Sequence, residues 1–462
     1  MDVPTDVTHW AEHHFGSVDL GDQRRTRRLV HSAARIAAHP EKTFPQVFAW
    51  NDLRGFYRLC DQSQATTATL MEPHWQHTRQ AMAQQSLVLL LHDTTELDFS
   101  SHHHLRGVGP IGNENGRGFL QHNSLAFVPQ PRQVLGLAYQ QFKVRQPAPA
   151  EETVHQRKRR ARESDLWREG FRATGAPPPG SCWVDVCDRG GDDYESLRAS
   201  RDVGHHFLFR ATQNRVVSVP AAQDQQAYLL DYARTLPSQG SDEVEIRGRG
   251  GRPARTARVS LAAAAIGVPA PTGTPKRHEQ PLLAAWVIRV WEPEPPADVA
   301  EPLEWILVCS LPTTTLEELL ERRDWYCCRW QVEVFHDIEK NGCSDEARRF
   351  ETAERLEACL AVLSVVAVRV FQLRSALDWQ PAEPAAQVGT ALEIELLRRY
   401  LQHRGRRFSV REFVRGVARL GGFLGRGSDG EPGVRALWRG YQRLQDMVLG
   451  HQLHTSPEED SG

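Results

Sequence analysis

The spacing of hydrophobic residues changes several times along the chain, and each change predicts a different kind of element. In residues 1–70, apolar positions recur every three or four residues, which predicts short helices. Further on, short continuous apolar runs bounded by polar and turn residues predict strands. These runs lie at 86–99, 119–128, 133–145, 182–187 and 205–215.

A second change in the pattern of hydrophobic and turn residues divides the rest of the chain. Residues 216–312 combine β-type runs with turns rich in glycine and arginine, which predicts a β-rich insertion. Helical periodicity returns from 314 to 374. The segment PAEPAA (381–386) indicates a linker, and a helical tail with a Gly-rich break follows. We therefore predict a helical domain at 1–70, an α/β domain at 71–373 and a helical domain at 374–462.

Two of the predicted strands stop at an acid. The first apolar run ends at Asp93, and the run 182–187 ends directly before Asp188. Polar residues at the carboxyl edge of a sheet lie where ligands bind. Two carboxylates from neighbouring strands suit Mg²⁺, which prefers oxygen ligands, and a third would complete a two-metal site for phosphodiester cleavage.

The stretch YCCRWQVEVFHDIEK (326–340) can supply that third acid. At about 100° per residue, Tyr326, Arg329, Glu333 and Lys340 fall within an arc of roughly 60° on a helix. Trp330 and His336 border this polar stripe, and apolar residues take the opposite side. A stripe of this kind is also typical of a solvated helix face, so the spacing leaves both interpretations open.

The charge of the chain adds only local information. The 462 residues carry a formal charge of −2, so DNA or RNA could be bound only through basic patches. One such patch is LGDQRRTRRL, where a predicted helix presents arginines that contact phosphate or simply solvate its face. These arginines are Arg24, Arg25, Arg27 and Arg28.

Other features indicate structure rather than chemistry. The eight cysteines include no C-x2-C pair, which argues against structural zinc and fits a cytoplasmic protein with reduced thiols. No secretion signal and no apolar run of membrane-spanning length is expected. GVGPIG (107–112) does not visibly open a helix, which argues against dinucleotide binding. We interpret the three histidines at 102–104 as a surface loop, and Asp192 and Asp193 as loop acids.

The spacing Y-x2-R-x3-E-x6-K at 326–340 resembles the signature of DDE cut-and-paste transposases of the insertion-sequence-four group. Within it, the chain is similar to the branch that includes the transposon-five transposase. LGDQRRTRRL, HDTTEL around Asp93, VCDRGGD around Asp188, PLEWILVCS and ARLGGFL support the likeness. The resemblance extends, in order, over nearly the whole chain.

This resemblance implies an RNase H-like core with a β-rich insertion, flanked by helical domains. It also implies that Asp93, Asp188 and Glu333 hold two Mg²⁺ or Mn²⁺ ions. The family nicks a transposon end, forms a hairpin, opens it and joins the 3′ end to target DNA. One metal site can serve each step, because each is an in-line substitution at phosphorus.

The resemblance also implies contacts with DNA. Arg329 and Lys340 would bind phosphates, Tyr326 would donate to one, and Trp305 would receive a flipped base. Further expected DNA contacts are Trp330, Arg210, His336, Arg24, Arg25, Arg27 and Arg28. A homodimer would bridge two double-stranded transposon ends in a synaptic complex, without a membrane and associated with the nucleoid.

Two alternatives remain beside this expectation. One is an RNase H-like nuclease that cuts without strand transfer. The other is a catalytically inert DNA-binding inhibitor, against which the intact set of three acids argues.

Overall fold

The computed structural model describes residues 5–112, 115–146, 151, 153, 162–246, 254–272, 281–296, 299, 301–427 and 429–455. Two further basic stretches of the sequence, 155–162 and 247–258, lie mostly outside these ranges, and residues 456–462 lie outside them entirely. The chain forms two compact units. The first comprises Met1–Gln84, Thr94–Val154 and Val332–Gly462, and the second comprises Gln85–Asp93 and His155–Gln331. These units do not test the predicted domain boundaries.

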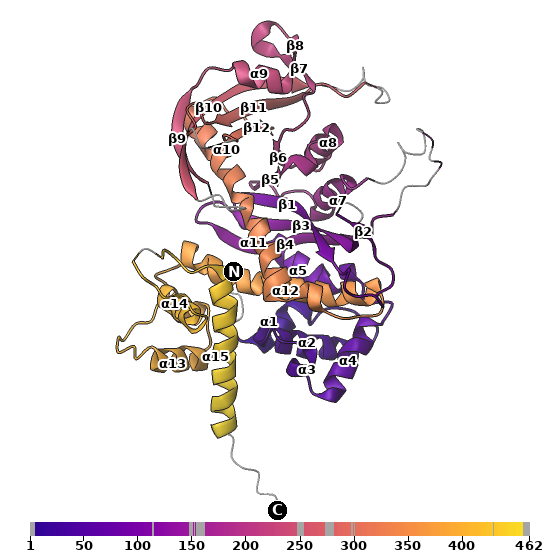
Figure 1. Cartoon of the computed structure of the whole chain (residues 1–462), viewed down its shortest axis with the longest axis vertical. Coiled ribbons are helices and arrows are strands. Elements are labelled where there is room, and N and C mark those ends of the chain that lie inside the picture. The colour runs from indigo at the N-terminus through magenta and orange to yellow at the C-terminus, as the bar shows by residue number, and fades with distance from the viewer. Residues whose placement is uncertain are drawn as a thin grey trace, which may run out of the picture. The chain divides into compact units, whose positions relative to one another are not determined.

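The second unit contains a mixed sheet (Figure 1). The first half of β1 (Leu87–Asp98) pairs in parallel with β5 (Cys182–Cys187), which pairs in parallel with β6 (His206–Arg210). Antiparallel β12 (Glu304–Cys309), β11 (Leu283–Trp291) and β10 (Arg255–Val268) continue the sheet. Its remaining strands are β7 (Val216–Val219), β8 (Gln225–Tyr228) and β9 (Gly240–Ile246).

The helices described in this unit are α7 (Asp165–Thr174), α8 (Tyr194–Asp202), α9 (Leu229–Thr235) and α10 (Leu316–Cys328). The prediction of a β-rich region at 216–312 is confirmed. Long runs of small and β-branched residues, such as VSLAAAAIGV in β10, favour this extended structure.

The first unit is mainly helical. Its N-terminal part contains α1 (Val7–Phe15), α2 (Gln23–Ala38), α3 (Phe44–Val47), α4 (Trp50–Cys60) and α5 (Thr67–Met82). The antiparallel strands β2 (Gly109–Ile111), β3 (Gly116–Val128) and β4 (Gln133–Lys143) follow. Helix α11 (Trp330–Asp337) belongs to this unit from Val332 onward. The C-terminal part also contains α12 (Ala353–Trp379), α13 (Ala391–Tyr400), α14 (Val410–Leu420) and α15 (Val434–Thr455). The predicted helical ends are confirmed.

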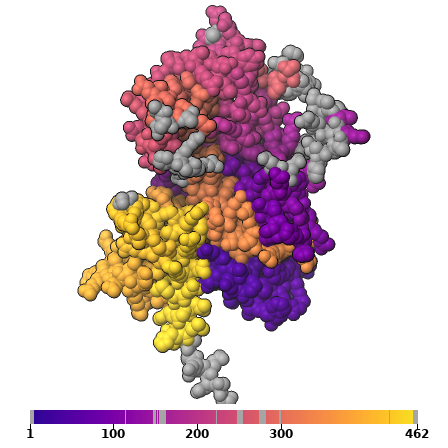
Figure 2. Space-filling view, viewed as in Figure 1, coloured from indigo at the N-terminus to yellow at the C-terminus, as the bar shows by residue number. Residues whose placement is uncertain are grey.

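Helix α12 is the centre of this unit. By length and composition it could cross a membrane, which contradicts the expectation that no apolar run is long enough. However, 78% of its most apolar window is buried, and it packs against α2, α5, β4 and α14. It is a core helix. Figure 2 shows N-terminal (indigo) and C-terminal (yellow) residues side by side in this unit, where Lys42 pairs with Asp446 at 2.7 Å.

Candidate functional site

Asp93 lies on β1, but the strand does not stop there. It runs on to Asp98, so the expectation that it ends at Asp93 is wrong. What does end is the pairing with β5, because the last paired residues are His92 and Cys187. Asp93 is therefore the first residue beyond the paired register. Its side chain is 16% exposed and lies 3.7 Å from the Arg329 guanidinium.

Asp188 directly follows β5, as predicted. It caps a short 3₁₀ turn, where its Oδ1 accepts the Gly190 N–H at 2.8 Å. Because His92 and Cys187 are the last paired residues of two parallel strands, Asp93 and Asp188 both lie directly beyond the same end of this pairing. The Cys187 thiol responds to both: burial raises its pKa most, and the charges of Asp185, Asp188 and Asp93 raise it further.

Cationic and aromatic side chains surround Asp188. Arg210 ends β6, Tyr326 lies on α10, and the Tyr326 ring meets that of Trp305 edge-on at 5.2 Å. Burial raises the pKa of Tyr326, and the Asp188 charge adds to this while Arg329 and Arg210 oppose it. The second unit thus brings five predicted site residues together around Asp188: Asp93, Arg210, Trp305, Tyr326 and Arg329.

The predicted single helix from Tyr326 to Lys340 is helical but is interrupted in two places. Helix α10 ends at Cys328 and α11 begins at Trp330, with Arg329 between them. After Asp337 the backbone widens into a π-helical turn, Ile338–Gly342, which carries Lys340. The predicted arc of about 60° assumed an unbroken α-helix, so it does not describe the direction of Lys340.

The third acid lies in the other compact unit. Glu333 is half-buried in the first turn of α11, and His336 is buried one turn later. Trp330, at the start of this helix, is half-buried. Because Glu333 belongs to the first unit and Asp93 and Asp188 to the second, a meeting of the three carboxylates stays a prediction.

The arginines of α2 differ in how they are held. Arg24 and Arg27 are exposed, and Arg24 pairs with Asp22 at 2.9 Å. Arg25 donates to the Leu20 carbonyl at 2.9 Å, and Arg28 pairs with Asp52 at 2.5 Å. Arg24 and Arg27 are therefore the better placed to meet an external phosphate.

A buried charged group was missed in the sequence. Asp185, inside β5, accepts from His92 Nε2 at 3.0 Å and from His205 Nδ1 at 3.0 Å, and all three side chains are 0% exposed. His205 Nε2 lies 2.7 Å from the Gly175 carbonyl, which can only accept. His205 therefore donates from both nitrogens, which is the charged imidazolium. The signal was available, since Asp185 interrupts the apolar run CWVDVC.

A cluster of imidazoles in the first unit was missed as well. Ring nitrogens of His13, His14 and His77 lie within 4.8 Å of one another, a spacing that could hold a metal ion. However, the Leu137 N–H donates to His74 Nε2, so His74 carries its proton on Nδ1 and donates it to His14 Nδ1 at 3.2 Å. Neutral His14 is then protonated on Nε2, which argues against it as a metal ligand.

The residues interpreted from the sequence as structural make structural contacts or lie in a turn or a short strand. Asp192 accepts the backbone N–H groups of Thr212 and Gln213, and Asp193 caps α8. Residues 109–111 of the Gly-rich run form β2 rather than opening a helix. Histidines 102–104 lie in a turn.

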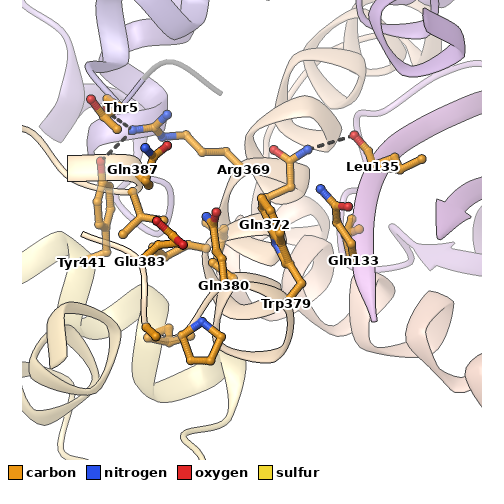
Figure 3. A pocket seen from close by; sticks show the side chains of 18 of the residues that line it. Thr5, Gln133, Leu135, Arg369, Gln372, Trp379, Gln380, Glu383, Gln387 and Tyr441 are labelled. Carbon is orange, nitrogen blue, oxygen red and sulfur yellow. Dashed lines mark hydrogen bonds between the residues drawn. The ribbon is translucent and has the colours of Figure 1, made fainter. Parts of the chain in front are cut away.

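The first unit also contains a cavity of about 550 Å³ between α12, residues 380–388 and α15 (Figure 3). Arg369 donates there to the Thr5 carbonyl, and Gln372 donates to the Leu135 carbonyl at 2.9 Å. Glu383 is the single acid among its lining residues, so the cavity offers no set of carboxylates for metal-dependent chemistry.

Comparison with known families finds matches at both ends of the chain. Residues 7–65 match the family described as "Transposase DNA-binding". Residues 403–461 match "Transposase Tn5 dimerisation domain". The first match covers α1 to α4 and supports DNA binding, and the second covers α14 and α15 and supports a homodimer.

Proposed function

We propose that this chain, which the two family matches indicate to be a Tn5-like transposase, cuts transposon ends and joins their 3′ ends to target DNA by metal-dependent phosphodiester transfer. One observation carries the proposal. Asp93 and Asp188 lie directly beyond the same end of the pairing between two parallel strands, with Arg210, Tyr326 and Arg329 around them. The parallel strands β1, β5 and β6 support an RNase H-like core.

The residues present suit a hard divalent cation. Both acids offer oxygen ligands at a partly exposed sheet edge. Among the described residues, Asp188 accepts the Gly190 N–H at Oδ1, whereas a carboxylate has about four lone-pair sites. We propose that Glu333 completes the set. When bound, two Mg²⁺ or Mn²⁺ ions would activate the attacking water or 3′-hydroxyl and stabilise the leaving oxygen.

The neighbouring side chains suit a phosphate and an unstacked base. Arg210 and Arg329 supply positive charge beside Asp188, where a phosphodiester would otherwise be repelled by the carboxylates. The raised pKa of Tyr326 keeps its hydroxyl protonated and able to donate. Trp305 is half-buried rather than part of the core, so its ring could stack with a flipped base.

The proposed sequence of reactions is the nick, the hairpin, its opening and the strand transfer, carried out by a homodimer on two ends. Lys340, Trp330 and His336 would contribute to DNA binding, with Arg24, Arg25, Arg27 and Arg28 at the end sequence. Arg24 and Arg27, the exposed pair, would make the first contacts.

Replacing Asp93 tests the proposal. Asp93→Ala should lower Mg²⁺-dependent cleavage of transposon-end DNA by on the order of 10³-fold, because a metal ligand acts in the transition state. End binding in a gel shift should be retained. Asp202→Ala is the control, since Asp202 is an exposed aspartate paired with Arg198 on α8. Cleavage by Asp93→Ala at the unmodified rate would show that the metal site is assigned wrongly.

A second arm separates transposase from nuclease. The unmodified protein is incubated with end-bearing DNA, Mg²⁺ and a target plasmid, and joined products are measured by gel and sequencing. Free ends that accumulate without joining would favour the nuclease.

A further inference from the structure

Glu339 is a fully buried acid beside one of the expected DNA-binding residues. Glu339 directly precedes Lys340 in the chain, but its side chain enters the core and is 0% exposed. Its Oε1 accepts from Gln121 Nε2 at 2.7 Å and from Ser364 Oγ at 2.7 Å. Gln140 Nε2 lies 3.4 Å from the same oxygen. Donors from β3, β4 and α12 therefore converge on one carboxyl oxygen.

Glu339 and Lys340 share the π-turn Ile338–Gly342. The turn is closed by the Cys343 N–H, which donates to the Ile338 carbonyl five residues earlier at 2.8 Å. A π-turn accommodates one residue more than an α-turn and therefore redirects the side chains it carries. Such turns need local compensation, because they interrupt the regular hydrogen bonds of a helix.

Lys340 leaves the same turn in another direction. Its Nζ donates to the Glu96 carbonyl at 2.5 Å and lies 3.6 Å from Glu346 Oε1. Its side chain remains 27% exposed, so the ammonium group can reach a ligand outside the protein. Two adjacent residues of one turn thus point in different directions: the Glu339 side chain is held in the core, and the Lys340 side chain is directed outward.

The buried carboxyl group is costly, which makes its hydrogen bonds informative. Burial raises the pKa of Glu339 and the donors Ser364, Gln121 and Gln140 oppose this, so that the pKa lies at about 7. A buried polar group without partners would destabilise the turn, whereas three donors on three other elements fix its register. A turn that placed Glu339 elsewhere would leave Gln121 Nε2 with only a longer contact, 3.5 Å from Asn123 Oδ1, and would remove one acceptor from Ser364 Oγ.

We infer that Glu339 is a positioning residue, whose hydrogen bonds hold the π-turn and thereby direct Lys340 to the Glu96 carbonyl. Its effect on DNA cleavage rests on the proposed function, since it acts through the contact of Lys340 with a phosphate. Its effect on the position of Lys340 does not.

Lysine labelling tests the positioning without DNA. The chain has five lysines, and Lys42 and Lys143 serve as internal references. Under limiting acetylation followed by mass spectrometry, Glu339→Ala should raise the labelling rate of Lys340 about fivefold relative to both references. Glu339→Gln keeps an acceptor oxygen and should restore the slow rate. Ser364→Ala, which removes a single donor, should give an intermediate rate even if Glu339→Ala fails to fold.

Glu393→Ala is the matched control. Glu393 is also buried and accepts from Tyr441 and Gln445, but it lies on α13. Its replacement should leave the labelling of Lys340 unchanged. The inference would be overturned if Lys340 labelling were unchanged in both Glu339→Ala and Ser364→Ala. It would also be overturned if Glu393→Ala raised Lys340 labelling as much as Glu339→Ala does.

A cleavage assay then connects the position to the function. Glu339→Ala should slow end cleavage, and the double variant with Lys340→Ala should be no slower than Lys340→Ala alone. A merely structural loss would add to that of Lys340→Ala, which would contradict action through Lys340. If labelling changes as expected but even the unmodified protein does not cleave, the positioning stands and the proposed function fails.

Discussion

Asp185 lies inside strand β5 and Asp188 directly follows its last residue, yet the surroundings of the two acids differ completely. Asp185 is enclosed inside β5 between His92 and His205 and is 0% exposed. Asp188 follows the last residue of β5, is half-exposed and accepts one backbone N–H. The Asp185 carboxylate accepts hydrogen bonds from His92 and His205, while the Asp188 carboxylate at the sheet edge keeps acceptor capacity for a ligand. Position along a strand, rather than residue type, therefore distinguishes the two roles.

The same contrast occurs in the first unit. Glu333 is half-buried in the first turn of α11, and Glu339 is buried in the π-turn after that helix. Three donors hold Glu339, and its place in the core fixes the backbone around it. In both units, one acid supports the structure close to an acid proposed to act on DNA.

The largest stability effect is expected at Asp185. Burial alone would raise the pKa of Asp185, but the charge and hydrogen bonds of His205 and His92 lower it well below its ordinary value. Asp185→Asn removes the charge that compensates His205 and should lower the free energy of unfolding by about 3 kcal/mol. Urea unfolding measures this. A loss below about 1 kcal/mol would contradict a charged pair.

The pH dependence of this variant sharpens the same point. Burial lowers the pKa of His205, but Asp185 and the Gly175 carbonyl raise it above its ordinary value of 6.5. The unfolded chain then loses this proton first, so the contribution of His205 is complete below pH 6.5 and is lost as pH rises through the folded pKa. Asp185→Asn should abolish this loss of stability above pH 6.5.

The imidazole cluster is expected to have a smaller effect on stability, with the opposite dependence on pH. Burial, with smaller contributions from the charges of His77 and His13, lowers the pKa of His74 from 6.5 to about 3. The unfolded chain therefore binds the proton more readily, so stability is present above pH 6.5 and falls as pH decreases. The protonation equilibrium of His74 alone should lower the free energy of unfolding by about 2 kcal/mol at pH 5, relative to pH values above 6.5. Hydrogen exchange of α1 and α5 measures this.

His74→Gln is the control for that measurement. Its amide can accept from the Leu137 N–H and donate to His14, as His74 does, but it does not titrate. The variant should be less sensitive to acid than the unmodified protein. An identical pH profile would mean that His74 is not the group that titrates.

The sequence allowed some elements and residues to be predicted, because local signals determine them. The strand before Asp188 is bounded by turn residues, and the helices at both ends follow apolar periodicity. The π-turn could not be predicted, since it depends on Gln121 and Ser364, which are far from Glu339 along the chain. Likewise, only the register between β1 and β5 shows why Asp93 is at an edge although its strand continues.

The smallest effect is expected at Asp193, which tests whether closeness to Asp188 is enough to make an acid functional. Asp193 caps α8 through the Ser196 N–H at 2.7 Å and pairs with Arg168 at 3.1 Å. Asp193→Ala should lower the free energy of unfolding by about 1 kcal/mol, as the loss of an N-cap does. Asp193→Ser, which can still cap the helix, should recover most of this loss. Cleavage of end DNA by both variants should stay near the unmodified rate. A large loss of cleavage with intact stability would instead place Asp193 among the acids that act on DNA, because its structural role alone could not produce that result.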